Sequence, residues 1–551
     1  MTEPAHHTIP IPDDFPFIWD DPTDATRTWD QGAGHFPEAM PRLEADFWLQ
    51  ALGGISRANA YFGAPQHALI RFFNNYLYMS NKLVVEQTEE ERAKEAAKAR
   101  IATVIEAIDT RWHKDFLPTI QSHIDFWDTF DLKAASTFEL LDHLDESWIR
   151  IGELWEIHFK IVPPAYDAMT RFTEYYKELF PDEEDAFAAH RLLQGLPNKT
   201  LDVGHGQWDL SQRAVAEPIV YRILTEQTPK DALTAFKTTA AGQDFLTELQ
   251  RYLQEYGQRG NHWSLSLTSW QEDPTPVLRN VQDYLKNPAN NPRSNHAALA
   301  ATREQAIAAT RKRLQGYPAL ARETFDAQLK QAQIGLIISE DHGFWIDFSA
   351  THKVRCVLLE CGRRLSYADV ITTTADIFLL HYDEVRTALA QLPAGNHRTL
   401  IKERRADLAH YRDLTPPKQL GVEPPPPEEN KPKEDEKEQP PATEDTLRGQ
   451  AGSPGTVRGP ARILDSLAQT DHLRPGDILV ASTPSPSWTP LFGKVAGIVT
   501  EVGGILSHPA VVAREYQIPA VIGLDKAREL ISEGQIIEVD GNVGLVRFVG
   551  V

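Results

Sequence analysis

The chain has 551 residues, 41% of them hydrophobic, which is enough apolar material for more than one folded core. A formal net charge of −22 argues against a nucleic-acid backbone as the main partner, because such binding rests on clustered lysines and arginines. The sequence shows no signal-like N-terminal segment and no run of about 20 apolar residues, so we expect a soluble cytoplasmic protein without a membrane partner.

Residues 1–420 are predicted to form one large, all-α domain. Apolar side chains recur through most of it at spacings of three and four, for example in 245–253 and 354–365. The stretches 87–110 and 295–330, rich in Ala, Glu, Lys and Arg, are typical of long helices that are exposed or antiparallel to a neighbour.

Residues 421–447 are predicted to be a flexible linker. Four consecutive prolines, Pro424 to Pro427, lead into a stretch of Glu, Lys, Asn and Pro that offers nothing to seed a core. The alternative is a surface loop, which is disfavoured because unstructured loops of this length are uncommon inside compact domains.

Residues 448–551 are predicted to form a small α/β domain. Short apolar segments alternate with glycine-containing turns, and short helices fit between some of them. The expected strands are 455–459, 477–480, 497–500, 520–523, 536–540 and 544–547, and the expected helices are 509–516 and 526–532.

The most informative local feature of this domain is His508. A predicted strand ends at Thr500, Gly503 and Gly504 permit a backbone path closed to other residues, and the histidine falls where a helix begins. Backbone N–H groups and the helix dipole would stabilise a phosphoryl group on His508, helped by the hydroxyls of Ser507 and Thr500. The alternative is a structural histidine at a helix N-terminus.

The segment from Gly449 to Val549 resembles the phosphohistidine swivelling domain of phosphoenolpyruvate (PEP) utilising enzymes. The resemblance rests on ordered motifs: Ser453-Pro454-Gly455, Gly476-Asp477-Ile478-Leu479-Val480, Thr489-Pro490-Leu491-Phe492, and Gly503-Gly504 through His508 to Ile518-Pro519. It implies that His508 is the phosphorylated residue. One departure is Tyr516-Gln517, where the family usually has a Leu-Gly pair.

Motifs in the helical region, such as Tyr256-Gly257-Gln258-Arg259-Gly260 and Ser269-Trp270-Gln271-Glu272-Asp273-Pro274, resemble the acceptor-binding region of rifampin phosphotransferase. We recognise neither an ATP-grasp region nor a pyruvate-binding barrel in the sequence. The architecture therefore looks most like the phosphohistidine subunit of phenylphosphate synthase or 4-methylphenyl phosphate synthase.

This resemblance implies an ATP-dependent phosphotransferase with a phenolic acceptor, phenol or cresol. It implies that ATP and Mg²⁺ are bound by a separate ATP-grasp subunit, that ATP ends as AMP and phosphate, and that this chain alone binds neither cofactor. The sequence offers no Cys, His and carboxylate cluster with metal-ligand spacing, so we expect no metal site.

Candidate residues for the acceptor site come from the helical region. A phenol loses its proton as it attacks phosphorus, which calls for a base, and the transferred phosphoryl group calls for guanidinium contacts. The candidate bases are His262, Asp341 and His342; the candidate phosphoryl ligands are Arg259, Arg355 and Arg364; the candidate aromatic lining is Trp263, Trp270, Phe344 and Trp345. Each has the alternative of a purely structural role.

Two other functions remain open at this point. One is phosphorylation of a larger hydroxylated natural product or antibiotic. The other is a regulatory or scaffold protein without turnover, which the intact Gly503-Gly504 and Ser507-His508 elements disfavour.

Overall fold

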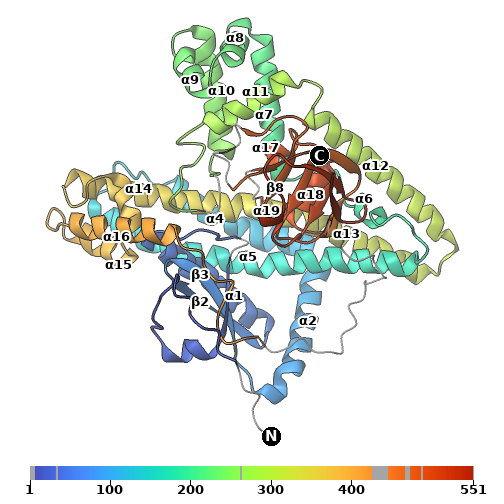
Figure 1. Cartoon of the computed structure of the whole chain (residues 1–551), viewed down its shortest axis with the longest axis horizontal. Helices are drawn as coiled ribbons and strands as arrows, with labels where there is room; N and C mark the ends of the chain where they lie inside the picture. The colour runs from blue at the N-terminus through green and yellow to red at the C-terminus, as the bar shows by residue number, and fades with distance from the viewer. Residues whose placement is uncertain are drawn as a thin grey trace. The chain divides into compact units, whose positions relative to one another are not determined.

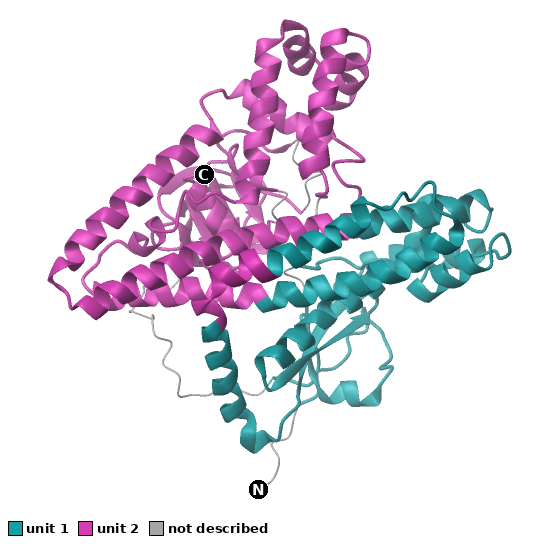
Figure 2. Cartoon of the chain, turned by 180° about the vertical axis from the view of Figure 1, so that it is seen from behind, with its two compact units in different colours: residues 1–103, 116–160, 353–441 teal, residues 104–115, 161–352, 442–551 magenta. Residues whose placement is uncertain are grey.

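The computed structural model describes residues 7–32, 35–260, 264–424, 445–465, 469, 472–484 and 488–549. Its contacts divide the chain into two compact units, each built from several stretches of sequence (Figure 2). Unit 1 comprises residues 1–103, 116–160 and 353–441, and unit 2 comprises residues 104–115, 161–352 and 442–551.

Unit 1 contains an antiparallel four-stranded sheet in the order β2-β3-β1-β4, so the prediction of an all-α region is wrong here. The strands are β1 (Thr28–Gln31), β2 (Gln66–Phe73), β3 (Tyr76–Leu83) and β4 (Gln419–Gly421). Asn74 and Asn75 join β2 to β3 with φ angles of 48° and 64°, a backbone that asparagine tolerates. Two asparagines between aromatic runs are a hairpin signal.

Helices make up the rest of the regular structure in unit 1. They are α1 (Arg42–Phe62), α4 (Leu117–Asp128), α15 (Tyr382–Ala390) and α16 (Arg398–Arg412), together with most of α2 (Glu90–Glu106) and α14 (Thr351–Tyr367) and the first half of α5 (Thr137–Leu179). Helix α2 confirms the long helix predicted within 87–110.

The helical part of unit 2 includes the end of α2, the short helix α3 (Ile108–Arg111) and the second half of α5, and it has two apolar cores. Its helices include α6 (Ala188–Arg191), α7 (Lys199–Ala216), α8 (Pro218–Glu226), α9 (Pro229–Phe236), α10 (Ala240–Tyr256), α11 (Thr275–Lys286), α12 (Pro292–Arg313) and α13 (Ala319–His342). The helix expected over 295–330 is thus two helices, because Pro318 cannot continue α12 and instead directly precedes α13.

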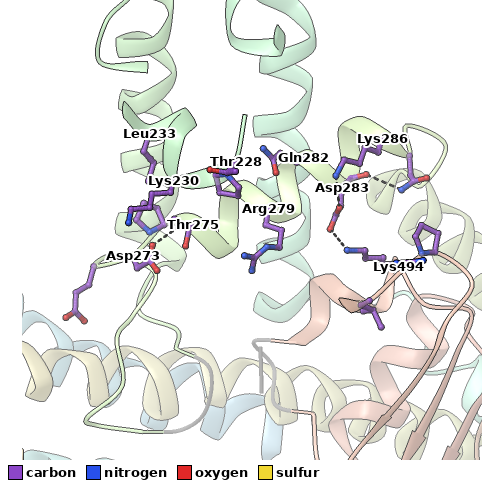
Figure 3. A pocket seen from close by; sticks show the side chains of 17 residues that line it. Thr228, Lys230, Leu233, Asp273, Thr275, Arg279, Gln282, Asp283, Lys286 and Lys494 are labelled. Atoms are coloured by element: carbon purple, nitrogen blue, oxygen red, sulfur yellow. Dashed lines mark hydrogen bonds and ion pairs between the residues drawn. The ribbon is translucent and has the colours of Figure 1, made fainter. Parts of the chain in front are cut away.

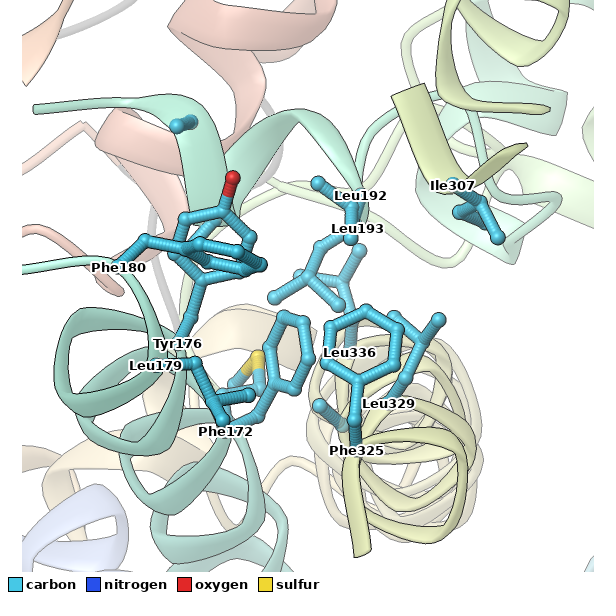
Figure 4. Packing of buried hydrophobic residues seen from close by; sticks show 14 of the residues in the cluster. Phe172, Tyr176, Leu179, Phe180, Leu192, Leu193, Ile307, Phe325, Leu329 and Leu336 are labelled. Carbon is cyan, nitrogen blue, oxygen red and sulfur yellow. The ribbon is translucent and has the colours of Figure 1, made fainter. Parts of the chain in front are cut away.

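One core of unit 2 lies between α5 and α13. In Figure 4, Phe325, Leu329 and Leu336 of α13 face Phe172 and Tyr176 of α5. The other core joins α7 to α11 and includes the buried face of α10 that the 245–253 periodicity predicts. Both cores form because each helix carries apolar residues on one face.

The C-terminal part of unit 2 is an eight-stranded mixed sheet with short helices, red in Figure 1, which confirms the predicted α/β character; β5 and β6 were not among the predicted strands. The strand order is β5-β12-β11-β7-β8-β9-β10-β6, and β7 to β10 are parallel. The strands are β5 (Thr446–Arg448), β6 (Gln450–Ser453), β7 (Thr456–Ile463), β8 (Ile478–Ala481), β9 (Gly497–Thr500), β10 (Ala520–Ile522), β11 (Ile536–Asp540) and β12 (Leu545–Phe548). The helices are α17 (Thr489–Phe492), α18 (His508–Glu515) and α19 (Ala527–Leu530).

Strands β4 and β5 reach into the two ends of the predicted linker, and its central residues 425–444 lie outside the described residues. Within the described ranges, no helix has the length and apolar character needed to span a membrane.

Candidate functional site

The loop between β9 and α18 places His508 at the first position of a helix. Gly503 has a φ of 117°, and a Cβ on it would lie 2.8 Å from the Ser507 hydroxyl oxygen, so only glycine fits this turn. Ser507 is the N-cap residue of α18, and Pro509 occupies its first turn. The structure therefore confirms that the histidine begins a helix after a glycine turn.

Two side chains contact the His508 imidazole. Its Nδ1 lies 3.0 Å from Oε2 of Glu340, and its Nε2 lies 3.3 Å from the hydroxyl oxygen of Thr489. An ionised carboxylate can only accept a hydrogen bond, so Nδ1 carries the proton and donates it to Glu340. In the neutral ring, Nε2 then presents its lone pair and accepts from Thr489.

Glu340 reaches the histidine because it continues the apolar stripe of α13. The stripe comprises Phe325, Leu329, Ala332 and Leu336, all buried in one core, and Glu340 follows one turn later on the same face. Val511 of α18 joins that core, which brings His508 to the carboxylate. Glu340 is not among the residues predicted from the sequence, although a carboxylate that continues an apolar stripe is a signal that helical periodicity can reveal.

The four predicted phosphoryl-supporting residues all lie in or beside the β9–α18 loop. Ser507 N–H donates to the carbonyl of Gly504 over 2.9 Å, and the Thr500 hydroxyl donates to the Val502 carbonyl over 2.9 Å. The Ser507 hydroxyl is buried and has no hydrogen-bond partner among the described residues. Of the two hydroxyls, Ser507 is therefore the one with capacity for a further acceptor or donor.

Arg259, a predicted phosphoryl ligand, lies fully buried in unit 2, with its guanidinium 4.8 Å from the ring centre of Phe348. Burial lowers the pKa of Arg259 to about 10, and the charges of Tyr252 and Glu340 oppose that shift. The interaction with Glu340 puts this cation in the electrostatic surroundings of the histidine.

The predicted bases Asp341 and His342 are engaged in the helical fold. Asp341 accepts a hydrogen bond of 2.7 Å from the Lys199 N–H at the start of α7, and burial raises the pKa of Asp341 to about 6. The Nδ1 atom of His342 lies 2.9 Å from the Ile338 carbonyl one turn earlier. These contacts give both residues structural partners.

The remaining predicted acceptor residues are distributed over both units. Trp270 is part of the core that joins α7 to α11, and His262 and Trp263 lie outside the described residues. Phe344 and Trp345 contact each other edge to face in unit 2. Arg355 and Arg364 belong to unit 1: the first lies over the Phe378 ring, and the second binds Glu360 and the carbonyls of Leu132 and Ala135.

Comparison with known proteins finds two family models that match parts of this chain. Residues 158–339 match the fourth domain of rifampicin phosphotransferase, and residues 473–544 match the mobile domain of PEP-utilising enzymes. The C-terminal part of the chain is therefore similar to the mobile domain of PEP-utilising enzymes. His508 lies inside this match, and Glu340 directly follows the other.

Three relatives show the extent of the similarity. Chondramide synthase cmdD of Chondromyces crocatus is 35% identical over 98% of this chain and 14% of its own length. Rifampicin phosphotransferase of Streptomyces sviceus is 28% identical over 71% of this chain, and prodigiosin synthesizing transferase PigC of Serratia marcescens is 29% identical over 63%. The chain spans 44% and 38% of those two relatives, respectively. The similarity supports a role in phosphotransfer.

A cleft of about 1040 Å³ separates the mobile domain from α9 and α11 in unit 2 (Figure 3). Its lining includes Lys230, Arg279 and Asp283 on the helical side and Arg474 and Lys494 on the mobile domain. Lys494 forms an ion pair of 3.2 Å with Asp283. No aromatic side chain lines this cleft among the described residues, and His508 and Glu340 are not part of it, so it does not match the aromatic pocket expected for a phenol.

Proposed function

We propose that this chain is part of an ATP-dependent phosphotransferase in which Nε2 of His508 carries the phosphoryl group to a hydroxyl acceptor bound by the helical region. The observation that carries the proposal is the pair of contacts on the imidazole. Glu340 holds the proton on Nδ1, which leaves Nε2 as the ring nitrogen that carries the phosphoryl group and releases it to the acceptor.

In the transfer to the acceptor, His508 and Glu340 account for the electron pair and the proton that move. The acceptor oxygen attacks phosphorus, the P–Nε2 bond breaks, and its electron pair returns to Nε2. The hydroxyl proton ends on Nε2, so the ring becomes an imidazolium paired with the Glu340 carboxylate. In the proposal, Ser507 and the N-terminal amides of α18 donate hydrogen bonds to the phosphoryl oxygens, and Arg259 supplies positive charge nearby.

The phosphoryl donor in this proposal is ATP bound with Mg²⁺ by an ATP-grasp chain or domain outside the present sequence. The resemblance of the mobile domain to those of PEP-utilising enzymes supports this arrangement. In it, Nε2 of His508 attacks the β-phosphorus of ATP and AMP leaves. Water then cleaves the β–γ bond of the pyrophosphoryl group on the ring, which releases phosphate and leaves the β-phosphoryl group on Nε2.

For the acceptor, our first candidate is a phenol or cresol, which would make the product an aryl phosphate. The second candidate is a larger hydroxylated natural product. The names of the relatives favour the second, because a chondramide synthase, a rifampicin phosphotransferase and a prodigiosin synthesizing transferase are all named for larger natural products.

The decisive test uses ATP labelled on the β-phosphate together with a purified ATP-grasp partner. Acid-labile label should appear on the wild-type chain and be absent from His508→Ala. The labelled chain, separated from ATP, is then offered phenol, cresol and rifampicin in parallel, and the compound that removes the label identifies the acceptor class. Undiminished label on His508→Ala would refute the proposal.

A further inference from the structure

One face of α18 carries three residues by which this helix meets the helical part of unit 2. His508, Val511 and Glu515 recur at spacings of three and four, which places them on the same side of the helix. His508 contacts Glu340, Val511 packs into the core that contains Leu336, and Glu515 binds a backbone N–H in the segment between α6 and α7. The helix therefore has a docking face with the histidine at one end and a carboxylate at the other.

At the carboxylate end of this face, specific hydrogen bonds hold both Glu515 and the segment that it contacts. Oε1 of Glu515 accepts a hydrogen bond of 2.8 Å from Gly195 N–H, and the Gly195 carbonyl accepts one of 2.6 Å from Arg303 of α12. Gly195 has a φ of 63°, and a Cβ there would lie 2.4 Å from the Ala300 nitrogen. The receiving segment is thus fixed against α12 and presents its N–H in one direction.

Tyr516, the residue after Glu515, is partly buried and packs against the apolar core of the mobile domain. Its hydroxyl oxygen lies only 3.1 Å from where a Cβ on Gly204 of α7 would stand, so the glycine makes room for it. Beside it, Asn290 donates a hydrogen bond of 2.6 Å to the Gly493 carbonyl of the mobile domain.

These contacts are suited to a surface that separates and reforms. A buried carboxylate is costly when it leaves water, and the second oxygen of Glu515 has no hydrogen-bond partner among the described residues. The polar contacts therefore specify one docked position without the large gain in stability that a purely apolar interface gives.

We propose that the α18 face, with Tyr516 beside it, is the surface by which the mobile domain docks on the acceptor-binding helical region. In this docked position, the contact of Glu515 with Gly195 holds His508 against Glu340. The occupant of this surface is the helical region of the same chain around Gly195 and α7. This inference rests on the proposed function, because a histidine that moves between two sites needs a defined docked position at each of them. Glu515 is a positioning residue, since it touches neither phosphorus nor acceptor.

The test compares hydrogen–deuterium exchange by mass spectrometry in the full chain carrying Glu515→Ala, Glu515→Gln or Glu529→Ala. Glutamine keeps an oxygen that can accept from Gly195 N–H, and Glu529 is an exposed residue of the same domain. We expect several-fold faster exchange for Glu515→Ala in peptides covering 193–199 and 508–516, and near wild-type exchange in the other two variants.

Two results would overturn this role of Glu515. One is unchanged exchange at 193–199 and 508–516 in Glu515→Ala. The other is equally faster exchange in β7 to β9, because that would mean Glu515 supports the fold of the mobile domain itself. The outcome is separable from that of the proposed function: His508→Ala tests the phosphoryl carrier, whereas this measurement needs neither ATP nor an acceptor.

Discussion

Nδ1 of His508 lies 3.0 Å from Oε2 of Glu340, although 168 positions separate the two residues in the sequence. The pairing joins the first residue of α18 to the last turn of α13, and both side chains are largely buried. It fixes the ring tautomer and offers a counter-charge to an imidazolium. The pair therefore has the two properties that transfer from Nε2 requires, a fixed tautomer before the step and a partner for the positive ring after it.

The first prediction concerns that carboxylate. Glu340→Gln keeps the shape of the side chain and removes its charge, so the imidazolium formed during transfer loses its partner. We expect the chain still to accept label from ATP and its ATP-grasp partner, and transfer from His508 to the acceptor to slow by roughly 10² or more. Single-turnover loss of the label measures this, with Glu529→Gln as control. Transfer at the wild-type rate would mean that the charge of Glu340 has no role in this step.

The second prediction concerns the turn before the histidine. Gly503→Ala forces a side chain onto a residue with a φ of 117° and toward the Ser507 hydroxyl. We expect a loss of about 1–3 kcal/mol in the free energy of unfolding and weaker labelling of His508. Thermal and denaturant unfolding measure the stability.

The matched control for this change is Gly316→Ala. Its Cβ would meet no atom within 4 Å, and its φ lies outside the left-handed region. Equal losses in the two variants would show that the turn geometry at Gly503 has no special cost.

The third prediction is a pH dependence of docking at Glu515. Burial raises the pKa of Glu515 to about 7, although the Gly195 N–H and Arg514 act in the opposite direction. A carboxyl whose pKa is raised on docking favours the docked state when it is protonated. Docking should therefore be strongest below the usual glutamate pKa and weaken as the pH rises through about 7.

Other titratable groups near Glu515 matter here, because a second group that changes charge would also make exchange depend on pH. Burial lowers the pKa of His190 to about 3 and that of Arg514 to about 10, so neither changes charge between pH 5 and 8. Arg303 and Glu340 also act on the Glu515 carboxyl. Exchange at residues 193–199, corrected for the intrinsic pH effect, should rise from pH 6 to pH 8 in the wild type. The same rise in Glu515→Gln would assign it to another group.

Much of the architecture can be predicted from periodicity and turn residues. The strands of the mobile domain follow from apolar segments between glycines, and the start of α18 follows from Gly503, His508 and Pro509. The hairpin of β2 and β3 was missed because its flanking helices dominate the pattern, although the Asn74-Asn75 turn marks it.

The acceptor-side carboxylate was harder to predict than His508. Local sequence shows what a residue can do in its own turn, as it does for His508. Glu340 acquires its role from a partner 168 positions away, and the choice between it and the neighbouring Asp341 depends on which helix face packs against α18. Helical phase separates the two, since Glu340 extends the stripe of Leu329 and Leu336.

The last prediction concerns the Pro-rich, charged segment from Gly421 to Thr446. Phosphoryl transfer requires the reacting atoms to approach to about 3 Å at each stop. In the proposed function, a fixed imidazole cannot meet that requirement both in the nucleotide site of the donor and beside Glu340, so the proposal requires the mobile domain to travel on a tether. Deleting residues 424–441 should therefore leave folding and acceptor binding unchanged and abolish product formation, measured as phosphorylated acceptor per chain.

Replacing the same residues with a Gly/Ser segment of equal length should restore product, because the proposal needs reach and solvation from the tether but no specific side chain. Product formation at the normal rate by the deleted chain would refute the travelling domain, even with His508 still phosphorylated.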